Sequence, residues 1–125
     1  MSVTTSQATG AQVRRKVLGD AYVDRTDQER DPFLAPFYQL AIDHAWGGVW
    51  TRPDLGLKER SLVTVSALAA LGRLHELRIH LGGALNNGWT PEELREACLQ
   101  TAAYAGFPAA LDAVKVLSEV VTKRG

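Results

Sequence analysis

The feature that most constrains the fold is the segment 57–85, which is apolar on more than one side of a helix. At about 100° per residue, one apolar stripe forms in this segment, while Leu68, Leu71 and Ile79 point well away from it. The stripe consists of Val63, Ala67, Ala70, Leu74, Leu77 and Leu81. A surface helix carries a single apolar face. We therefore expect a central helix or helix pair, kinked or broken at Gly72, in an all-α domain.

The remaining helices are predicted from capping residues and turn signals. Asp31 and Pro32 mark one helix start, and Thr90 followed by Pro91 and Glu93 forms a capping box at another. The expected helices outside the central segment span residues 12–18, 31–46, 90–104 and 109–122, and the polar stretch 24–31 is expected to be a connection. We expect about six helices in a compact single domain over residues 11–125, after a disordered tail over residues 1–10.

Composition excludes several classes of protein. The 125 residues include 14 basic and 14 acidic side chains, and this balance disfavours a nucleic-acid surface, which needs clustered positive charge. The longest apolar run, Ala67 to Leu71, is far too short to span a membrane. The N-terminal stretch has no secretory pattern, so we expect a cytoplasmic protein. Cys98 is the single cysteine, which excludes an intrachain disulfide and a multi-cysteine metal site.

Three titratable residues recur in the central segment at spacings of three and four. Arg73, Glu76 and His80 all follow Gly72, and in one continuous helix they share an arc of about 60°. Two interpretations remain open from the pattern alone. The three side chains form either a solvated charge stripe, or a sequestered set that contacts a charged ligand, since burial makes unpaired charges costly.

Other candidate residues carry weaker signals. Arg52 and Arg60 are suited to binding carboxylates through two parallel hydrogen bonds, although a lone arginine is more often a surface ion-pair residue. Trp46 and Trp50 are more typical of a core or a subunit contact than of a substrate platform. Cys98 lies in an apolar periodic helix and is expected to be buried.

Several common enzyme motifs are absent from the sequence. It has no phosphate-cradling glycine loop, no His-Glu-x-x-His pair and no serine nucleophile elbow. These absences disfavour nucleotide-dependent enzymes, zinc hydrolases and serine hydrolases.

A family resemblance covers nearly the whole chain from Val13 onward. The strings that carry it are RRKVLGDAYVDR (14–25), AWGGVWTRP (45–53), RSL (60–62), LGRLHELRIH (71–80), NNG (86–88) and QTAAYAGFPAA (100–110). Together they resemble the carboxymuconolactone decarboxylase family, within the alkylhydroperoxidase D-like superfamily. The resemblance implies an all-helical fold that assembles into homo-oligomers, commonly trimers or hexamers, with sites lined partly by a neighbouring chain.

The resemblance also implies an activity. It indicates cofactor-independent decarboxylation of 4-carboxymuconolactone, a small dicarboxylate lactone, to 3-oxoadipate enol-lactone in the β-ketoadipate pathway of protocatechuate breakdown, without a metal. The matched strings assign catalytic roles to His80 and Glu76. They assign substrate binding to Arg73, Arg60, Arg52 and Trp50. His80 is the expected proton donor, because histidine titrates near neutral pH.

One departure separates the chain from the thiol peroxidases of the same superfamily. In their signature, Cys-x-x-Cys is followed by three intervening residues and then a histidine, and on His80 this spacing puts Arg73 and Glu76 at the two cysteine positions. Neither side chain performs sulfur redox chemistry. A peroxidase-like redox enzyme is therefore the disfavoured alternative, and a non-catalytic helical assembly subunit is a further one.

Overall fold

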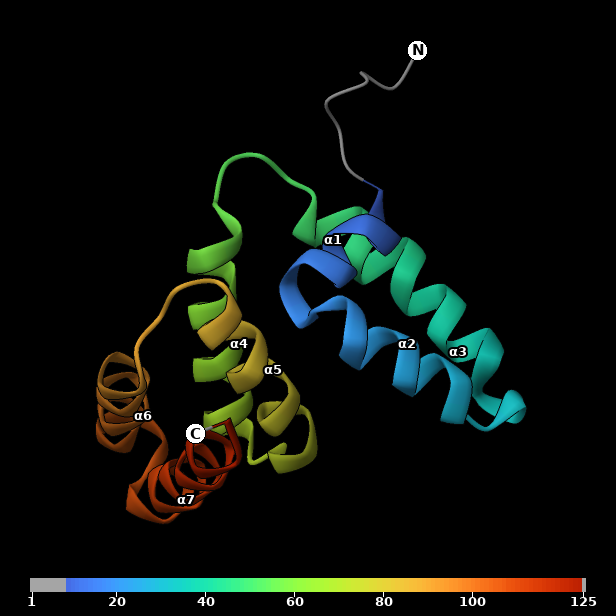
Figure 1. Cartoon of the computed structure of the whole chain (residues 1–125). Coiled ribbons are helices and arrows are strands. Elements are labelled where there is room, and N and C mark those ends of the chain that lie inside the picture. Colours follow the sequence, from blue (N-terminus) through green and yellow to red (C-terminus); the bar gives the residue numbers. More distant parts are fainter. Residues whose placement is uncertain (1–8, 125) are drawn as a thin grey trace. The chain divides into compact units, whose positions relative to one another are not determined.

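The structure is a computed structural model that describes residues 9–124, and these residues form an all-α fold (Figure 1). The α-helices are α1 (Gly10–Leu18), α2 (Asp20–Glu29), α3 (Ala35–Leu40), α4 (Leu57–Leu71), α5 (Leu74–Asn86), α6 (Pro91–Ala105) and α7 (Phe107–Arg124). A 3-10 turn, η1 (Pro32–Leu34), precedes α3, and a π-helical segment, η2 (Ala41–Trp50), follows it. The all-α prediction is confirmed, with seven α-helices in the described part where about six were expected.

The chain divides into two compact units, residues 1–56 and residues 57–125. The expected tail over residues 1–8 lies outside the described residues. Thr9 and Gly10, which were expected in that tail, instead begin α1: the Thr9 side chain accepts a hydrogen bond from the backbone N–H of Gln12, and the Gln12 side chain accepts one in return from the Thr9 N–H. This reciprocal pair satisfies backbone donors that a helix start otherwise leaves unpaired.

Helix α2 corrects the prediction that residues 24–31 form a connection. The helix is mostly polar, and Val23 is its buried residue. Its apolar periodicity is therefore weak. Ion pairs to the preceding helix supplement this small apolar contact: Arg15 of α1 pairs with Asp20 at 3.2 Å and with Asp24 at 2.7 Å. These surface ion pairs connect α1 to α2.

The segment after Asp31 differs from the single helix expected over residues 31–46. The Asp31 side chain accepts a hydrogen bond from the Phe33 N–H, as a capping residue should, and the helical path then continues through Gly47 and Gly48 to Trp50. These glycines were read as a helix end. Instead, α1 packs on η2, and a Cβ at Gly10 would collide with the backbone of Ile42 and Gly47. Here glycine permits close approach of two helical segments.

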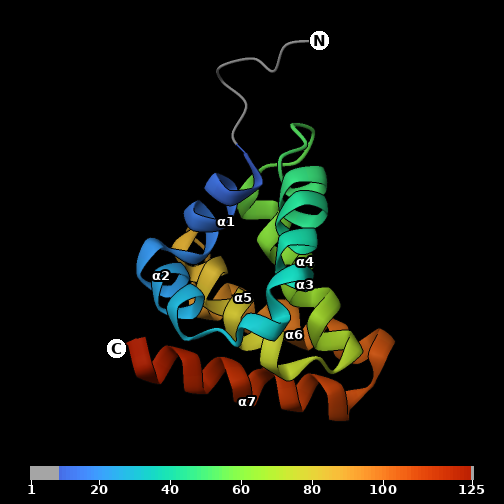
Figure 2. The ribbon, with the colours of Figure 1, turned by 90° about the vertical axis from the view of Figure 1, so that its right-hand side faces the viewer.

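The second unit holds the main hydrophobic core. Helix α5 packs against α4 and α7, and α6 also packs against α4 and α7. Figure 2 shows α7 along its whole length. The core consists of Val65, Ala69, Leu77, Leu81, Ala84, Leu94, Cys98, Ala113, Val116, Leu117 and Val120. The segment 57–85 is therefore a central helix pair, as its two-sided apolar pattern predicts.

The break between α4 and α5 lies at Gly72, which adopts φ +72°. Its N–H donates to the Ala69 carbonyl at 3.2 Å, and the Arg73 N–H donates to the Leu68 carbonyl at 3.0 Å. This pair of bonds is a Schellman-type helix end, for which the left-handed conformation of glycine is suited. Arg73 therefore precedes α5 as its N-cap residue, with φ −87° and ψ 76°. The expectation that Arg73, Glu76 and His80 belong to one helix is wrong for Arg73.

The last two helices start at the predicted turn signals. Thr90 forms the expected capping box with Glu93, and Pro91 occupies the first turn. Gly106, with φ +99°, ends α6. Helix α7 begins at Phe107 and runs to Arg124, beyond both ends of the expected 109–122. The earlier start is possible because Pro108 lies in the first turn, where its missing N–H is tolerated. Among the described residues, no helix is both long and apolar enough to cross a bilayer.

Two glycine-to-alanine substitutions test the α4–α5 turn. Gly72→Ala should destabilise the protein by about 1 kcal/mol, because alanine disfavours positive φ although nothing lies within 4 Å of an added Cβ. Gly82→Ala, within α5, should stabilise it by about 0.5–1 kcal/mol, because alanine is the better helix former. Urea unfolding measures both effects. A change in the free energy of unfolding that has the same sign in both variants would contradict the left-handed turn.

Candidate active site

Helix α5 positions the two predicted catalytic residues. Its apolar face buries Leu77 and Leu81 completely, and this orientation directs Glu76 and His80 toward a different side of the helix. Glu76 lies in the first turn and is exposed, whereas His80, one turn later, is half-buried. Arg73 is exposed at the helix start. The structure thus brings Glu76 and His80 onto neighbouring turns, with Arg73 at the adjoining end.

The environment of His80 favours a neutral imidazole. Burial lowers its pKa from 6.5 to about 4, and the nearby negative charge of Glu76 opposes this shift without cancelling it. Desolvation penalises the charged form of histidine, which accounts for the direction of the shift. His80 is therefore neutral at pH 7 in the unliganded chain. This differs from the expected donor that titrates near neutral pH, and it means that protonation of His80 near neutral pH requires a negative charge in addition to that of Glu76.

Arg60 lies at the opposite end of the α4–α5 pair from Arg73. Its neighbour Ser61 is fully buried, and the Ser61 hydroxyl accepts a 2.8 Å hydrogen bond from the side-chain amide of Asn87, just beyond α5. The start of α4 therefore packs beside the end of α5. With a rise of about 1.5 Å per residue, the Arg60 and Arg73 backbones lie about 20 Å apart along α4. These two guanidinium groups cannot bind the same carboxylate.

Trp50 and Arg52 belong to the first unit. Trp50 ends η2, is 9% exposed and stacks on Trp46 with ring centroids 4.7 Å apart and planes at 28°. This stacked pair matches the expectation of a core or contact aromatic. Arg52 follows in an exposed turn, where its N–H donates to the Val49 carbonyl at 3.0 Å. The turn presents the Arg52 side chain on the surface of this unit.

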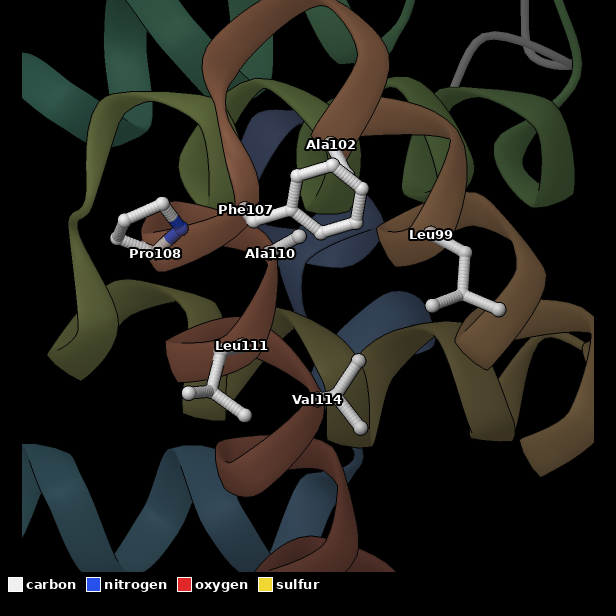
Figure 3. Close-up of a pocket in the computed structure, with 7 residues that line it drawn as sticks. All are labelled: Leu99, Ala102, Phe107, Pro108, Ala110, Leu111 and Val114. Atoms are coloured by element: carbon white, nitrogen blue, oxygen red, sulfur yellow. The ribbon is translucent and has the colours of Figure 1, made fainter.

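One hollow within the second unit is almost entirely apolar. It has a volume of about 510 Å³ and is lined by Leu99 and Ala102 of α6 and by Phe107, Pro108, Ala110, Leu111 and Val114 of α7 (Figure 3). A site for a doubly charged acid needs cationic or hydrogen-bonding groups to replace lost hydration. This apolar hollow therefore does not suit a dianion. None of its lining residues is among the predicted site residues.

A second hollow lies between α4 and α6 and includes Tyr104. Its volume is about 300 Å³, and Tyr104 is 87% exposed beside it. Tyr104 therefore does not cover the core. The described residues contain no group of three or more histidine, cysteine or acidic side chains arranged to hold a metal ion.

Comparison with known proteins gives a consistent result. The model of the carboxymuconolactone decarboxylase family matches residues 35–119, more than half of the chain. The chain belongs to this family. It is 43% identical over 116 residues to a 4-carboxymuconolactone decarboxylase of Acinetobacter baylyi, covering 93% of this chain and 87% of that protein. It is 40% identical over 112 residues to a nitrosuccinic acid decarboxylase of Metarhizium robertsii, covering 90% and 78%.

Both of these relatives are decarboxylases, and this member of the family is a carboxy-lyase. The burial of its single cysteine is in keeping with a reaction that does not use a thiol. Cys98 is fully buried in the core, and burial raises its pKa above the usual value for a thiol. Reactive cysteines are instead exposed and have lowered pKa values. The thiol peroxidase alternative thus lacks an accessible thiolate.

The lowered pKa of His80 predicts how stability depends on pH. The folded chain releases the His80 proton more readily than the unfolded chain, so this contribution to stability is complete above pH 6.5 and is lost as the pH falls toward 4. The total loss is about 3 kcal/mol for a shift of this size. His80→Gln should remove this part of the pH dependence, whereas His75→Gln, at an exposed position of the same helix, should retain it.

Urea unfolding at several values between pH 4 and 7 measures this difference. Parallel pH profiles for wild type and His80→Gln would contradict the desolvated imidazole.

Proposed function

We propose that this carboxy-lyase converts 4-carboxymuconolactone into 3-oxoadipate enol-lactone and CO2 without a cofactor. The observation that carries the proposal is the 43% identity to a protein named for this substrate, over 93% of the chain. The charged set at α5 adds chemical support, because the substrate is a dianion and the reaction moves one proton. Arginine, glutamate and histidine are residue types suited to those two tasks.

The substrate itself supplies the electron sink. The ring carbon that loses CO2 also carries a carboxymethyl arm and lies next to a carbon–carbon double bond conjugated to the lactone carbonyl. When the carbon–carboxylate bond breaks, its electron pair moves through the double bond to the carbonyl oxygen and forms a dienolate. A proton then adds to the carbon beside the carbonyl, which gives the enol-lactone. The protein must therefore hold the retained carboxylate, stabilise the dienolate oxygen and deliver the proton.

We assign these tasks to the residues around α5. Arg73, at the positive end of the helix dipole, binds the retained carboxylate with its guanidinium. His80 donates its N–H to the developing oxyanion and transfers the proton. The bound dianion raises the pKa of the imidazole, which burial otherwise holds at about 4, and so makes proton uptake favourable only when substrate is present. Glu76, one turn earlier, orients the imidazole. Trp50, Arg52 and Arg60 remain proposed substrate contacts.

Nitrosuccinate is a second candidate substrate, favoured by the 40% identity to a nitrosuccinic acid decarboxylase. In both acids, a carbon next to an electron-withdrawing group carries a carboxylate and a carboxymethyl arm. Loss of that carboxylate gives a delocalised anion in each case, a dienolate or a nitronate. The shared fragment is a succinate with an electron sink on one of its central carbons. We propose that the site recognises this fragment and that the sink determines the preferred substrate.

The cellular setting follows from the same proposal. The reaction places the protein in protocatechuate breakdown, within the cytoplasm. We propose a homo-oligomer, trimeric or hexameric, in keeping with the resemblance found in the sequence. Size-exclusion chromatography with light scattering measures the assembly directly.

The activity is tested by incubating purified protein with freshly generated 4-carboxymuconolactone or nitrosuccinate in the presence of a chelator. Ultraviolet absorbance follows the substrate, and CO2 detection follows the other product. We expect a saturable rate with the lactone and a lower rate with nitrosuccinate. Release of CO2 from nitrosuccinate alone would replace the first candidate by the second. No CO2 from either acid would refute the proposal.

A histidine pair on α5 tests the assigned role of His80. His80→Gln should lower kcat by about 100-fold or more, because proton transfer by a positioned side chain contributes about that much. His75→Gln, exposed on the same helix, should retain the wild-type rate. Circular dichroism checks that both variants fold. Wild-type turnover by His80→Gln would exclude this imidazole from the reaction.

A further inference from the structure

A charged cluster in the first unit has no role in the proposed reaction. Arg14 of α1 lies with its Nη1 atom 3.2 Å from Oδ1 of Asp27 in α2. Arg30, which follows α2, places its Nη2 atom 3.0 Å from the same Asp27 oxygen. The side chains of Arg14 and Arg30 are only 9% and 14% exposed, whereas that of Asp27 is 40% exposed. Two largely buried cations therefore share one half-exposed carboxylate.

The charges of this cluster do not balance. Two guanidinium groups against one carboxylate leave one excess positive charge, and sequestered charges are costly unless they are paired and hydrogen-bonded. Arg14 satisfies this condition, since its Nη1 hydrogen-bonds both carboxylate oxygens of Asp27, at 3.2 and 3.4 Å. Arg30 forms only the ion pair with Asp27, and the geometry of this pair is not that of a hydrogen bond. The excess charge thus belongs to Arg30.

One edge of the Arg30 guanidinium is unsatisfied. The Nε and Nη2 atoms are buried, and within residues 9–124 they donate no hydrogen bond. The face of the same group stacks on the Tyr38 ring, with the guanidinium carbon 3.7 Å from the ring centroid. Stacking fixes the plane of the group, and its Nε–Nη2 edge keeps donors without an acceptor even though Nη2 lies 3.0 Å from the Asp27 oxygen. That edge matches the two oxygens of a carboxylate through parallel hydrogen bonds.

We propose that the Arg30 edge is a binding site for a small carboxylic acid, separate from the residues of α5. The bound carboxylate accepts one hydrogen bond from Nε and one from Nη2, and it neutralises the excess charge of the cluster. Arg30 lies where α2 ends and the chain turns into η1, and its neighbours Glu29, Asp31 and Pro32 are exposed. The ligand reaches the edge through local opening of this turn, which contains little buried apolar surface.

Arg25, within α2, provides a matched control. It also lies over a tyrosine ring, that of Tyr22, but its guanidinium carbon is 5.6 Å from the centroid and the residue is exposed. Both arginines thus carry the same charge near the same kind of ring. They differ in burial and in the unsatisfied edge, which is the feature that the proposal requires.

The test is a titration of the whole chain with sodium acetate at constant ionic strength, followed by NMR of the arginine Nε–H groups. The Arg30 signal, assigned with Arg30→Lys, should shift and saturate, while the Arg25 signal should not. Acetate should also raise the Tm of wild type and of Arg25→Lys. Arg30→Lys, which keeps the charge but loses the paired donors, should weaken binding by about tenfold or more.

An unchanged Arg30 signal, or equal responses of Arg30 and Arg25, would overturn the proposal. An acetate-dependent Tm that is the same in Arg30→Lys and in wild type would also do so. These results are independent of CO2 release from the lactone, so failure of this site leaves the decarboxylase proposal intact.

Discussion

Burial of one face of α5 is the interaction on which the site depends. Leu77 and Leu81 are completely withdrawn from water, in the core formed by α4, α5, α6 and α7. Burying side chains of this size contributes about 1.5–3 kcal/mol each. Because this face fixes the rotation of the helix, it also fixes the directions of Glu76 and His80. The position of His80 at the margin of buried surface then follows from this packing.

That position has a chemical consequence. A desolvated imidazole resists protonation even beside Glu76, and in the proposed reaction the bound anionic substrate raises its proton affinity. The left-handed turn at Gly72 complements this arrangement, because it ends α4 and places Arg73 at the start of α5. The chain itself thus places a cation at the helix start and, one to two turns later, the imidazole to which we assign proton donation.

The sequence predicted the elements whose signals are local and apolar. The capping box at Thr90 and the two-sided apolar segment 57–85 were recognisable, because caps and core faces leave fixed spacings. Helix α2 was missed because it is mostly polar and Val23 is its buried residue, so its sequence carries little apolar periodicity. The spacing of Glu76 and His80 was likewise recognisable in the sequence, and both residues lie on α5. The sequence did not reveal the non-helical Arg73 or the lowered pKa of His80, since both arise from tertiary structure.

The central claim is that His80 is sequestered and responds to a bound dianion. NMR titration of the imidazole measures this directly, in the unliganded protein and with saturating succinate, a non-reactive dicarboxylate. The account predicts a pKa near 4 without ligand and a clearly higher value with it. A pKa near that of free histidine, about 6.5, under both conditions would contradict it.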